Sequence, residues 1–183
     1  MNRWKTLKSE YLIRRPWLTA RRDAVQLPNG VINDEFYVLE YPDWVNIIAI
    51  TPGGDFVFVR QYRYALDLDS IELCAGVIEP GETPEQGARR ELLEETGYGG
   101  GTWQEIMTIG QNPSTCSNWT HCFLATGVEK LQDQHLDRTE DIDVLLLTRH
   151  QVLQMLQSGQ LKQALMLAPL WQYFAQSGQY AMK

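Results

Sequence analysis

The chain has 183 residues, 44% of them hydrophobic and 21% charged, an ordinary composition for one globular domain with a small appendage. Its formal net charge of −7 argues against a nucleic-acid-binding protein, because such proteins usually present a basic face to the phosphate backbone. Apolar runs fall well short of the roughly 20 residues that span a bilayer, and no apolar signal-peptide core follows the N-terminus, so we expect a soluble, cytoplasmic protein that binds neither nucleic acid nor membrane.

The N-terminal part has the pattern of a β-hairpin. Residues 11–25 and 35–41 form two extended stretches, separated by the strong turn signal Pro28-Asn29-Gly30. We therefore expect residues 1–41 to be a β-hairpin appendage and residues 42–183 to be the main domain. A two-stranded hairpin is marginal alone, so either its own chain or a partner subunit must cover its aromatic surface. The aromatic residues of this segment are Tyr11, Trp17, Phe36, Tyr37 and Tyr41.

The main domain begins with a predicted hairpin, residues 44–50 and 55–61, with Gly53-Gly54 in its turn. Helical periodicity follows near the C-terminus over residues 150–157 and 160–176, and Pro169 should kink or divide the second helix. Strands interleaved with a central helix and C-terminal helices indicate mixed α/β layers. Further short strands are predicted at residues 71–73, 103–109, 120–125 and 142–147.

The central helix is predicted over residues 84–96 by local signals. Thr83 is a good N-cap, Pro84 is pre-set for the first helical position, and Gln86 completes a capping box. Gly97 can adopt the left-handed conformation that ends a helix.

One face of this helix is acidic. Glu91, Glu94 and Glu95 stand at i, i+3 and i+4, so their carboxylates project together and repel each other. A solvated acidic face is one interpretation, although such a face normally intersperses lysines, and the neighbours here are Arg89 and Arg90. The other interpretation is a site for hard divalent cations such as Mg²⁺, which prefer oxygen ligands and neutralise the repulsion.

The stretch from residue 76 to residue 98 resembles the Nudix box, G-x5-E-x7-R-E-U-x-E-E-x-G-U, where U is an aliphatic residue. Tyr98 departs from the pattern at the last position. Seven fixed residue types would coincide by chance about once in 10⁸ starting points, so the motif is highly specific. The matching residues are Gly76, Glu82, Arg90, Glu91, Leu92, Glu94, Glu95 and Gly97.

This resemblance implies the Nudix fold, an α/β fold with a mixed β-sheet sandwiched between helices, from about residue 44 to the C-terminal helix. It also implies structural roles within the motif. Glu82 would brace the loop, and Arg90 would orient the helix carboxylates. Gly76 and Gly97 would be structural residues, where the backbone requires glycine.

Two flanking segments resemble those of ADP-ribose pyrophosphatases. Residues 59–63, Val-Arg-Gln-Tyr-Arg, and residues 72–76, Glu-Leu-Cys-Ala-Gly, are similar to V-R-Q-Y-R and E-L-P-A-G, with Cys74 where proline is common. The resemblance implies that the carbonyl of Ala75 is a metal ligand. Pro113 stands where ADP-ribose-type members carry a proline, but the residues after it lack the family's S-P-G-x-S-D-E run.

A second acidic group is implied in the loop before the last strand. Residues 138–142, Arg-Thr-Glu-Asp-Ile, resemble the family's E-x-E-D-I loop, and Glu140 is the candidate metal ligand or general base. Arg138 stands where a second glutamate is frequent, so the base would be Glu140 itself or a metal-bound hydroxide. The alternative for Glu140 is a simple surface carboxylate.

Substrate contacts are expected from four residues. Arg60 and Arg63 could clamp phosphates bidentately, or could form ion pairs at a strand edge. Glu72, in the segment before the box, is a further candidate for substrate binding. Trp44 could stack on a purine, or could be an ordinary core residue.

The resemblance implies a Mg²⁺-dependent pyrophosphohydrolase, with Mn²⁺ as an alternative ion, that acts on a nucleoside diphosphate sugar, ADP-ribose first. Glu91, Glu94, Glu95, Glu140 and Ala75 would hold the metal. Alternatives are NADH, GDP-mannose, dinucleoside polyphosphates or a nucleoside triphosphate as substrate, and a non-catalytic ligand-sensing module. The resemblance also implies a homodimer with exchanged N-terminal strands.

Overall fold

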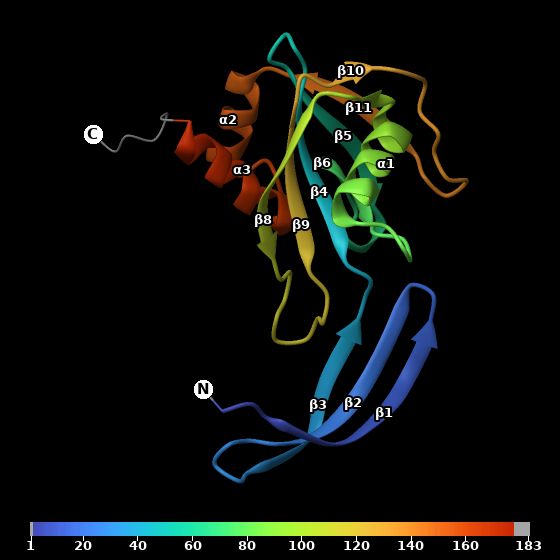
Figure 1. The fold of residues 1–183 in the computed structure, drawn as a ribbon, viewed down its shortest axis with the longest axis vertical. Helices are drawn as coiled ribbons and strands as arrows, with labels where there is room; N and C mark the ends of the chain where they lie inside the picture. The colour runs from blue at the N-terminus through green and yellow to red at the C-terminus, as the bar shows by residue number, and fades with distance from the viewer. Residues whose placement is uncertain (1, 178–183) are drawn as a thin grey trace. The chain divides into compact units, whose positions relative to one another are not determined.

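The computed structural model describes residues 2–177, and these divide into two compact units (Figure 1). The first unit comprises residues 2–42 and 110–119, and the second comprises residues 43–109 and 120–177. No helix in the described part of the chain is both long enough and apolar enough to cross a bilayer.

The first unit is a three-stranded antiparallel sheet with the order β1-β2-β3. Strand β1 spans Lys5–Arg15, β2 spans Leu18–Gln26 and β3 spans Ile32–Glu40. The hairpin β2–β3 is the one predicted around Gly30, whose positive φ of 85° suits a glycine. The expectation of one extended stretch over residues 11–25 was wrong, because the chain reverses between β1 and β2. That turn carries no glycine or asparagine to mark it in the sequence.

A second segment of the chain joins this sheet at β3. The N–H of Leu39 donates to the carbonyl of Thr115 at 2.8 Å, and the N–H of Ser117 donates to the carbonyl of Leu39 at 3.1 Å. The Asn118 amide also donates to the carbonyl of Pro42 at 3.1 Å. The sequence prediction of an appendage limited to residues 1–41 did not anticipate this segment.

The second unit contains a mixed six-stranded sheet with the order β11-β5-β6-β4-β9-β8. Strands β4 and β9 are parallel, and the other neighbours are antiparallel. All six strands overlap the predicted ones, although β6 is longer than expected. Their bounds are Trp44–Ile50 for β4, Phe56–Arg63 for β5, Leu68–Val77 for β6, Thr102–Ile109 for β8, Thr120–Thr126 for β9 and Ile142–Leu147 for β11.

Helices cover both faces of this sheet (Figure 1). Helix α1, Pro84–Thr96, lies on one face, and α2, Arg149–Gln157, and α3, Ala164–Gln176, lie on the other. Three short elements complete the unit: the 3-10 turn η1, Tyr64–Leu66, and the strand pair β7, Tyr98–Gly99, with β10, Glu129–Lys130. The predicted mixed sheet between helices is therefore confirmed.

Strand β4 supplies side chains to both layers of the core. Val45 and Ile47 pack with Leu92 of α1, whereas Ile48 packs with Leu170 of α3. Successive residues of a strand point to opposite faces, so a strand covered on both sides is a nearly continuous apolar run. A polar residue inside such a run requires an explanation.

Asn46 is that polar residue, and the effect of Pro169 on helix α3 explains why a polar side chain is buried here. Pro169 lies inside α3, which continues through it rather than being divided. Proline has no N–H to donate to the carbonyl four residues earlier, which belongs to Leu165. The side-chain Nδ2 of Asn46 donates to this carbonyl at 2.9 Å and takes the place of the missing helical donor. Helix α3 begins at residue 164, later than the predicted residue 160.

Candidate active site

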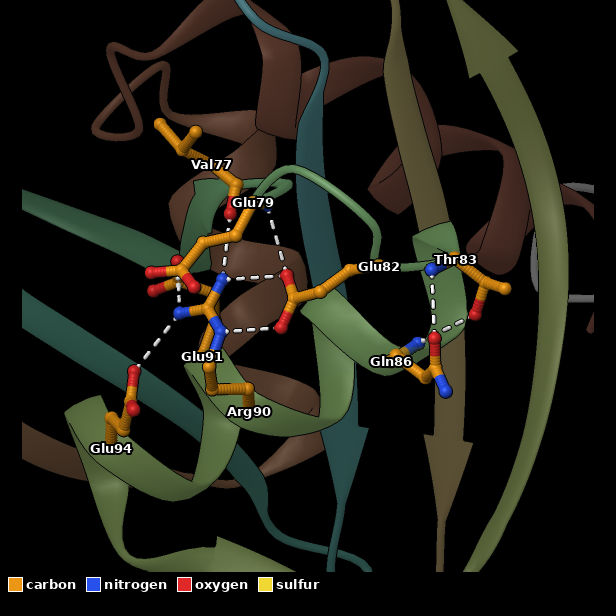
Figure 2. Close-up of polar contacts among 8 residues, drawn as sticks. All are labelled: Val77, Glu79, Glu82, Thr83, Gln86, Arg90, Glu91 and Glu94. Atoms are coloured by element: carbon orange, nitrogen blue, oxygen red, sulfur yellow. Dashed lines mark hydrogen bonds and ion pairs between the residues drawn. The ribbon is translucent and has the colours of Figure 1, made fainter.

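The helix at the centre of the candidate site is fixed locally by its caps, as the sequence predicted. The Thr83 hydroxyl accepts from the N–H of Gln86 at 3.2 Å, and the Gln86 side chain accepts from the N–H of Thr83 at 2.8 Å (Figure 2). Gly97 ends the helix with φ of 72°. A Cβ on Gly97 would lie 2.1 Å from the carbonyl oxygen of Gln132, so steric contact as well as conformation requires glycine here.

Arg90 ties the preceding loop and strand to this helix. Its Nε and Nη2 donate to the two carboxylate oxygens of Glu82 at 2.8 and 3.0 Å, and Nη2 also donates to the carbonyl of Val77 at 2.8 Å (Figure 2). Glu82 in turn accepts from the N–H of Glu79 at 2.9 Å. The hydrogen bonds to Glu82 raise the pKa of Arg90, and those from Arg90 lower the pKa of Glu82.

The remaining nitrogen of Arg90 faces the acidic side of the helix. Nη1 donates to Glu91 at 2.9 Å and to Glu94 at 3.0 Å (Figure 2). Arg90 therefore holds two of the three clustered carboxylates in place and offsets part of their mutual repulsion.

The third carboxylate, Glu95, is the most deeply placed, with the residue 6% exposed. Burial raises its pKa to about 8, although hydrogen bonds from Cys74 and from the N–H of Ala75 oppose this effect. Burial also raises the pKa of Glu91. The backbone of β6 lies against both side chains, since a Cβ on Gly76 would stand 2.0 Å from the carboxylate carbon of Glu91. Glycine at this position allows the strand and the carboxylate to be neighbours.

Glu140 lies in the exposed loop before β11, where its carboxylate accepts from the N–H of Asp137 at 2.9 Å. Its negative charge contributes to the raised pKa values of Glu91 and Glu95, so the loop brings it within electrostatic reach of the cluster. A side chain that sequence reasoning missed anchors this loop: Gln134 donates to the carbonyl of Glu95 at 2.6 Å.

The described residues contain no set of three or more His, Cys, Asp or Glu side chains already converged as metal ligands. Glu91 and Glu94 turn toward Arg90 instead. The donor set nevertheless fits a hard divalent cation, because it consists of carboxylate and carbonyl oxygens. Glu91 and Glu95 are desolvated and repel each other when both are ionised, which is a further reason for this fit, since a cation would stabilise the ionised form of both.

A cavity of about 390 Å³ adjoins this cluster. Arg63 and Glu72 line it as a bidentate ion pair, Nε to Oε1 at 2.9 Å and Nη2 to Oε2 at 2.5 Å, and Glu72 is only 1% exposed. Trp44 and Ala75 also line the cavity. Arg60 does not line it and instead pairs with Asp143 in an exposed contact between β5 and β11, the strand-edge alternative considered for it.

Sequence reasoning missed part of this lining. Asn46, two residues after Trp44 on β4, faces the same cavity, and strand periodicity could have indicated this. Strand periodicity could not have identified the segment before α3, because only the tertiary fold brings this segment to the cavity. The further lining residues include Ser70, Thr120, Lys162, Gln163, Leu165 and Met166.

Comparison with known proteins identifies the family. The sequence profile of the NUDIX domain matches residues 40–167, and the profile described as nucleoside diphosphate sugar hydrolase N-terminal domain matches residues 4–39. The chain therefore belongs to the Nudix family of hydrolases, whose members generally use divalent metal ions.

The alignments with individual relatives cover most of the chain. It is 30% identical over 161 residues to an ADP-ribose pyrophosphatase of Bacillus subtilis strain 168, covering 87% of this chain and 86% of the relative. It is 34% identical over 151 residues to a methanol dehydrogenase activator of Bacillus methanolicus, covering 82% and 81%. A crystal structure of an ADP compounds hydrolase shares the fold, with a TM-score of 0.84 over 97% of each chain at 20% identity.

We predict that Glu95→Gln removes a pH dependence from the stability of the protein in EDTA. Because the pKa of Glu95 rises from 4.5 to about 8 on folding, the folded chain retains a proton that the unfolded chain releases above pH 4.5. The unfolding free energy of the wild-type protein should therefore fall as the pH rises through this window, by at most about 1.4 kcal/mol per pH unit. Urea denaturation between about pH 5 and about pH 8 measures the slope.

The same measurement with Mg²⁺ tests the metal assignment. Added Mg²⁺ should raise the stability of the wild-type protein near pH 8 and raise that of Glu95→Gln much less. Glu85→Gln, an exposed change in the first turn of α1, is the matched control and should behave as wild type. Parallel pH profiles and equal Mg²⁺ responses for wild type and Glu95→Gln would contradict the assignment.

Proposed function

We propose that this Nudix hydrolase cleaves the pyrophosphate bond of a nucleoside diphosphate sugar, with ADP-ribose favoured, to a nucleoside monophosphate and a sugar phosphate. The observation that carries the proposal is the placement of the α1 carboxylates against Ala75 and Gly76. These two residues line a cavity together with Arg63 and Glu72. The relatives named ADP-ribose pyrophosphatase support the choice of substrate class.

GDP-mannose is the second candidate substrate. A relative named GDP-mannose pyrophosphatase from Enterobacter sp. strain 638 is 30% identical over 130 residues, covering 67% of each chain. A non-catalytic sensing module is disfavoured because the chain keeps all the acidic residues of the motif. NADH and dinucleoside polyphosphates carry the same pyrophosphate linkage and belong in any substrate panel.

Each group of the site has a proposed task. Mg²⁺, or Mn²⁺ in its place, would be held by the Ala75 carbonyl and the carboxylates of Glu91, Glu94 and Glu95, and would supply charge neutralisation and a water of lowered pKa. Arg63 would present its remaining donors to the substrate phosphates while Glu72 fixes its orientation. Glu140 would add a metal-ligand oxygen or accept the proton of the attacking water.

The proposal extends to the cellular setting. Cys74, Cys116 and Cys122 are all free thiols, and the first and third are buried. Unpaired cysteines are typical of reducing compartments, which supports a cytoplasmic enzyme.

The function is tested by incubating the protein and Mg²⁺ with ADP-ribose, GDP-mannose, NADH and diadenosine polyphosphates, and identifying the monophosphate released. ADP-ribose should give AMP with the highest kcat/KM. Glu95→Gln should lower hydrolysis by at least ~10²-fold, and Glu140→Gln should lower kcat with little change in KM, because both groups act mainly in the transition state.

Glu129→Gln, a change of another exposed glutamate, is the control and should retain wild-type kinetics. Hydrolysis of none of these substrates, or near-normal activity of Glu95→Gln, would contradict the proposed function. A rise in KM alone for Glu140→Gln would make Glu140 a substrate-binding residue and leave the base to be sought elsewhere.

We also propose a homodimer in which the N-terminal strands are exchanged and help to complete the partner's site. The three-stranded sheet exposes more apolar surface than a free sheet usually presents to water, with Trp17 at 82% exposure. A two-fold interface formed by this surface would be self-complementary. The exposed large apolar residues on β1 and its flanks are Trp4, Leu7, Tyr11, Leu12, Ile13 and Trp17.

Light scattering at micromolar concentration should give the mass of a dimer, and Leu12→Asp should shift it toward the monomer, because a buried charge without a partner is unfavourable. Activity should fall with the dimer fraction. Leu146→Asp, on an exposed apolar residue of the second unit, is the control and should stay dimeric. A wild-type monomer, or a dissociated variant with full activity, would refute the exchanged arrangement.

A further inference from the structure

The last turn of α1 is bound by the chain segment of residues 130–135. A helix leaves its last four carbonyl groups without donors from the helix itself, and in α1 these belong to residues 93–96. The first of them accepts from the N–H of Gly97 at 2.8 Å. Residues 130–135 supply donors for the other three. The pairs are Lys130 Nζ with the carbonyl of Thr96 at 2.9 Å, Gln134 Nε2 with that of Glu95 at 2.6 Å, and the N–H of His135 with that of Glu94 at 2.8 Å.

Further contacts fix the same segment against the end of α1. The carbonyl of Gly97 accepts from the N–H of Leu131 at 2.8 Å and from that of Gln132 at 3.3 Å. Strand β10, which leads into the segment, pairs with β7, which directly follows the helix. The path of the chain as far as residue 135 is therefore set by the C-terminal end of α1.

Gln134 also contacts the start of the next strand. Its Nε2 donates to the carbonyl of Ile142, the first residue of β11, at 3.0 Å, in addition to the carbonyl of Glu95. A primary amide nitrogen carries two hydrogens, so both are used. One side chain thereby closes the base of the loop of residues 135–141, which runs from the end of α1 to β11 (Figure 1).

Glu140 lies in this loop, in a turn that is closed on itself. The N–H of Glu140 donates to the carbonyl of Asp137 at 2.9 Å, and the Glu140 carboxylate accepts from the N–H of Asp137 at 2.9 Å. Because the turn holds the side chain of Glu140 against its own backbone, the place of this carboxylate relative to α1 depends on how the base of the loop is held. Gln134 provides that connection to the helix.

We propose that Gln134 is a positioning residue for Glu140. By bonding the carbonyl of Glu95 and closing the base of the loop, it sets the Glu140 carboxylate against the acidic side of α1. This inference rests on the proposed function, in which Glu140 acts on the metal or on the attacking water. A misplacement of about 1 Å caused by a distant change can lower a rate by about 10²-fold, so a tether of this kind matters for turnover.

The test is Gln134→Met, which keeps the length of the side chain and removes both donors. With ADP-ribose and Mg²⁺, kcat should fall by at least ~10-fold with little change in KM, because the group that is positioned acts mainly in the transition state. In a Glu140→Gln background the same change should lower kcat by less than ~3-fold, because two residues that act as one unit are not additive.

Two further variants complete the design. Gln132→Met, on the same segment, is the matched control and should keep wild-type kinetics, because residue 132 bonds α1 through its backbone N–H. Gln134→Asn keeps the amide but is one methylene shorter, so it cannot bond both carbonyls, and it should lower kcat by at least ~3-fold. It decides the question if Gln134→Met does not fold, as judged by urea denaturation.

Wild-type kcat in the folded Gln134 variants would overturn the proposal. An equal loss in the wild-type and Glu140→Gln backgrounds would also overturn it, because Gln134 would then act on the helix and not through Glu140.

Amide hydrogen exchange separates this inference from the proposed function, since it requires no hydrolysis. The amides of residues 136–141 should exchange at least ~10-fold faster in Gln134→Met and at the wild-type rate in Gln132→Met. If the wild-type protein hydrolyses none of the substrates, the proposed function fails, and faster exchange would still support the tether. Unchanged exchange in Gln134→Met would refute it.

Discussion

The organisation of the site depends on one guanidinium group. Arg90 bonds the carboxylate of Glu82 with two nitrogens, the carbonyl of Val77 with one of these, and Glu91 and Glu94 with the third. A planar fork with five donors suits this task, and an ammonium group could not reproduce it. Loop, strand and helix are thereby held in one geometry, and two carboxylates that would otherwise repel each other have a common positive partner.

Burial then gives the carboxylates different environments. Glu94 is the most exposed of the three, Glu91 is partly buried, and Glu95 is buried against Cys74 and Ala75. A buried carboxylate is stabilised either by a proton or by a cation. A divalent ion at the proposed site would stabilise the ionised form of these carboxylates, which agrees with the general metal dependence of the family.

Strand β6 connects this cluster to the cavity. The N–H of Ala75 donates to Glu95 at 3.3 Å, and Gly76 lets Glu91 approach the backbone, while Glu72 on the same strand holds Arg63. The strand thus presents its backbone to the carboxylates that we propose as metal ligands, and a charged pair to the cavity. In the proposed function, the substrate phosphates would lie beside this strand, close to the proposed metal ligands.

Features encoded in short stretches of sequence could be predicted. The bounds of α1, its capping box and Gly97 were all evident because capping depends on residues at most a few positions apart. The turn between β1 and β2 contains Pro16 but no glycine or asparagine, unlike the Pro-Asn-Gly turn before β3, so two strands were taken for one extended stretch. Helix α3 began later than periodicity suggested, because residues 160–163 are not helical although Leu161 among them is buried in the core.

Side-chain contacts between distant segments could not be predicted. The position of Arg60 opposite Asp143 depends on the pairing of β5 with β11, which no local pattern encodes. Asn46 illustrates the same limit. Its partner is the carbonyl of Leu165, which lacks a helical donor because of Pro169, and Pro169 lies 123 positions after Asn46 in the sequence (169 − 46). The motif identified the acidic cluster, and only the fold revealed that Asn46 lines the neighbouring cavity.

The most direct test of this account is the affinity of Arg90→Lys for Mg²⁺, measured by calorimetry alongside Arg89→Lys. Both changes keep the charge, but Arg89 contacts Glu85 and the ring of Trp103 rather than the acidic cluster. We predict at least ~10-fold weaker Mg²⁺ binding for Arg90→Lys, on the scale of losing a residue that orients metal ligands, and wild-type affinity for Arg89→Lys. Equal, wild-type affinity for both variants would contradict the central role of Arg90.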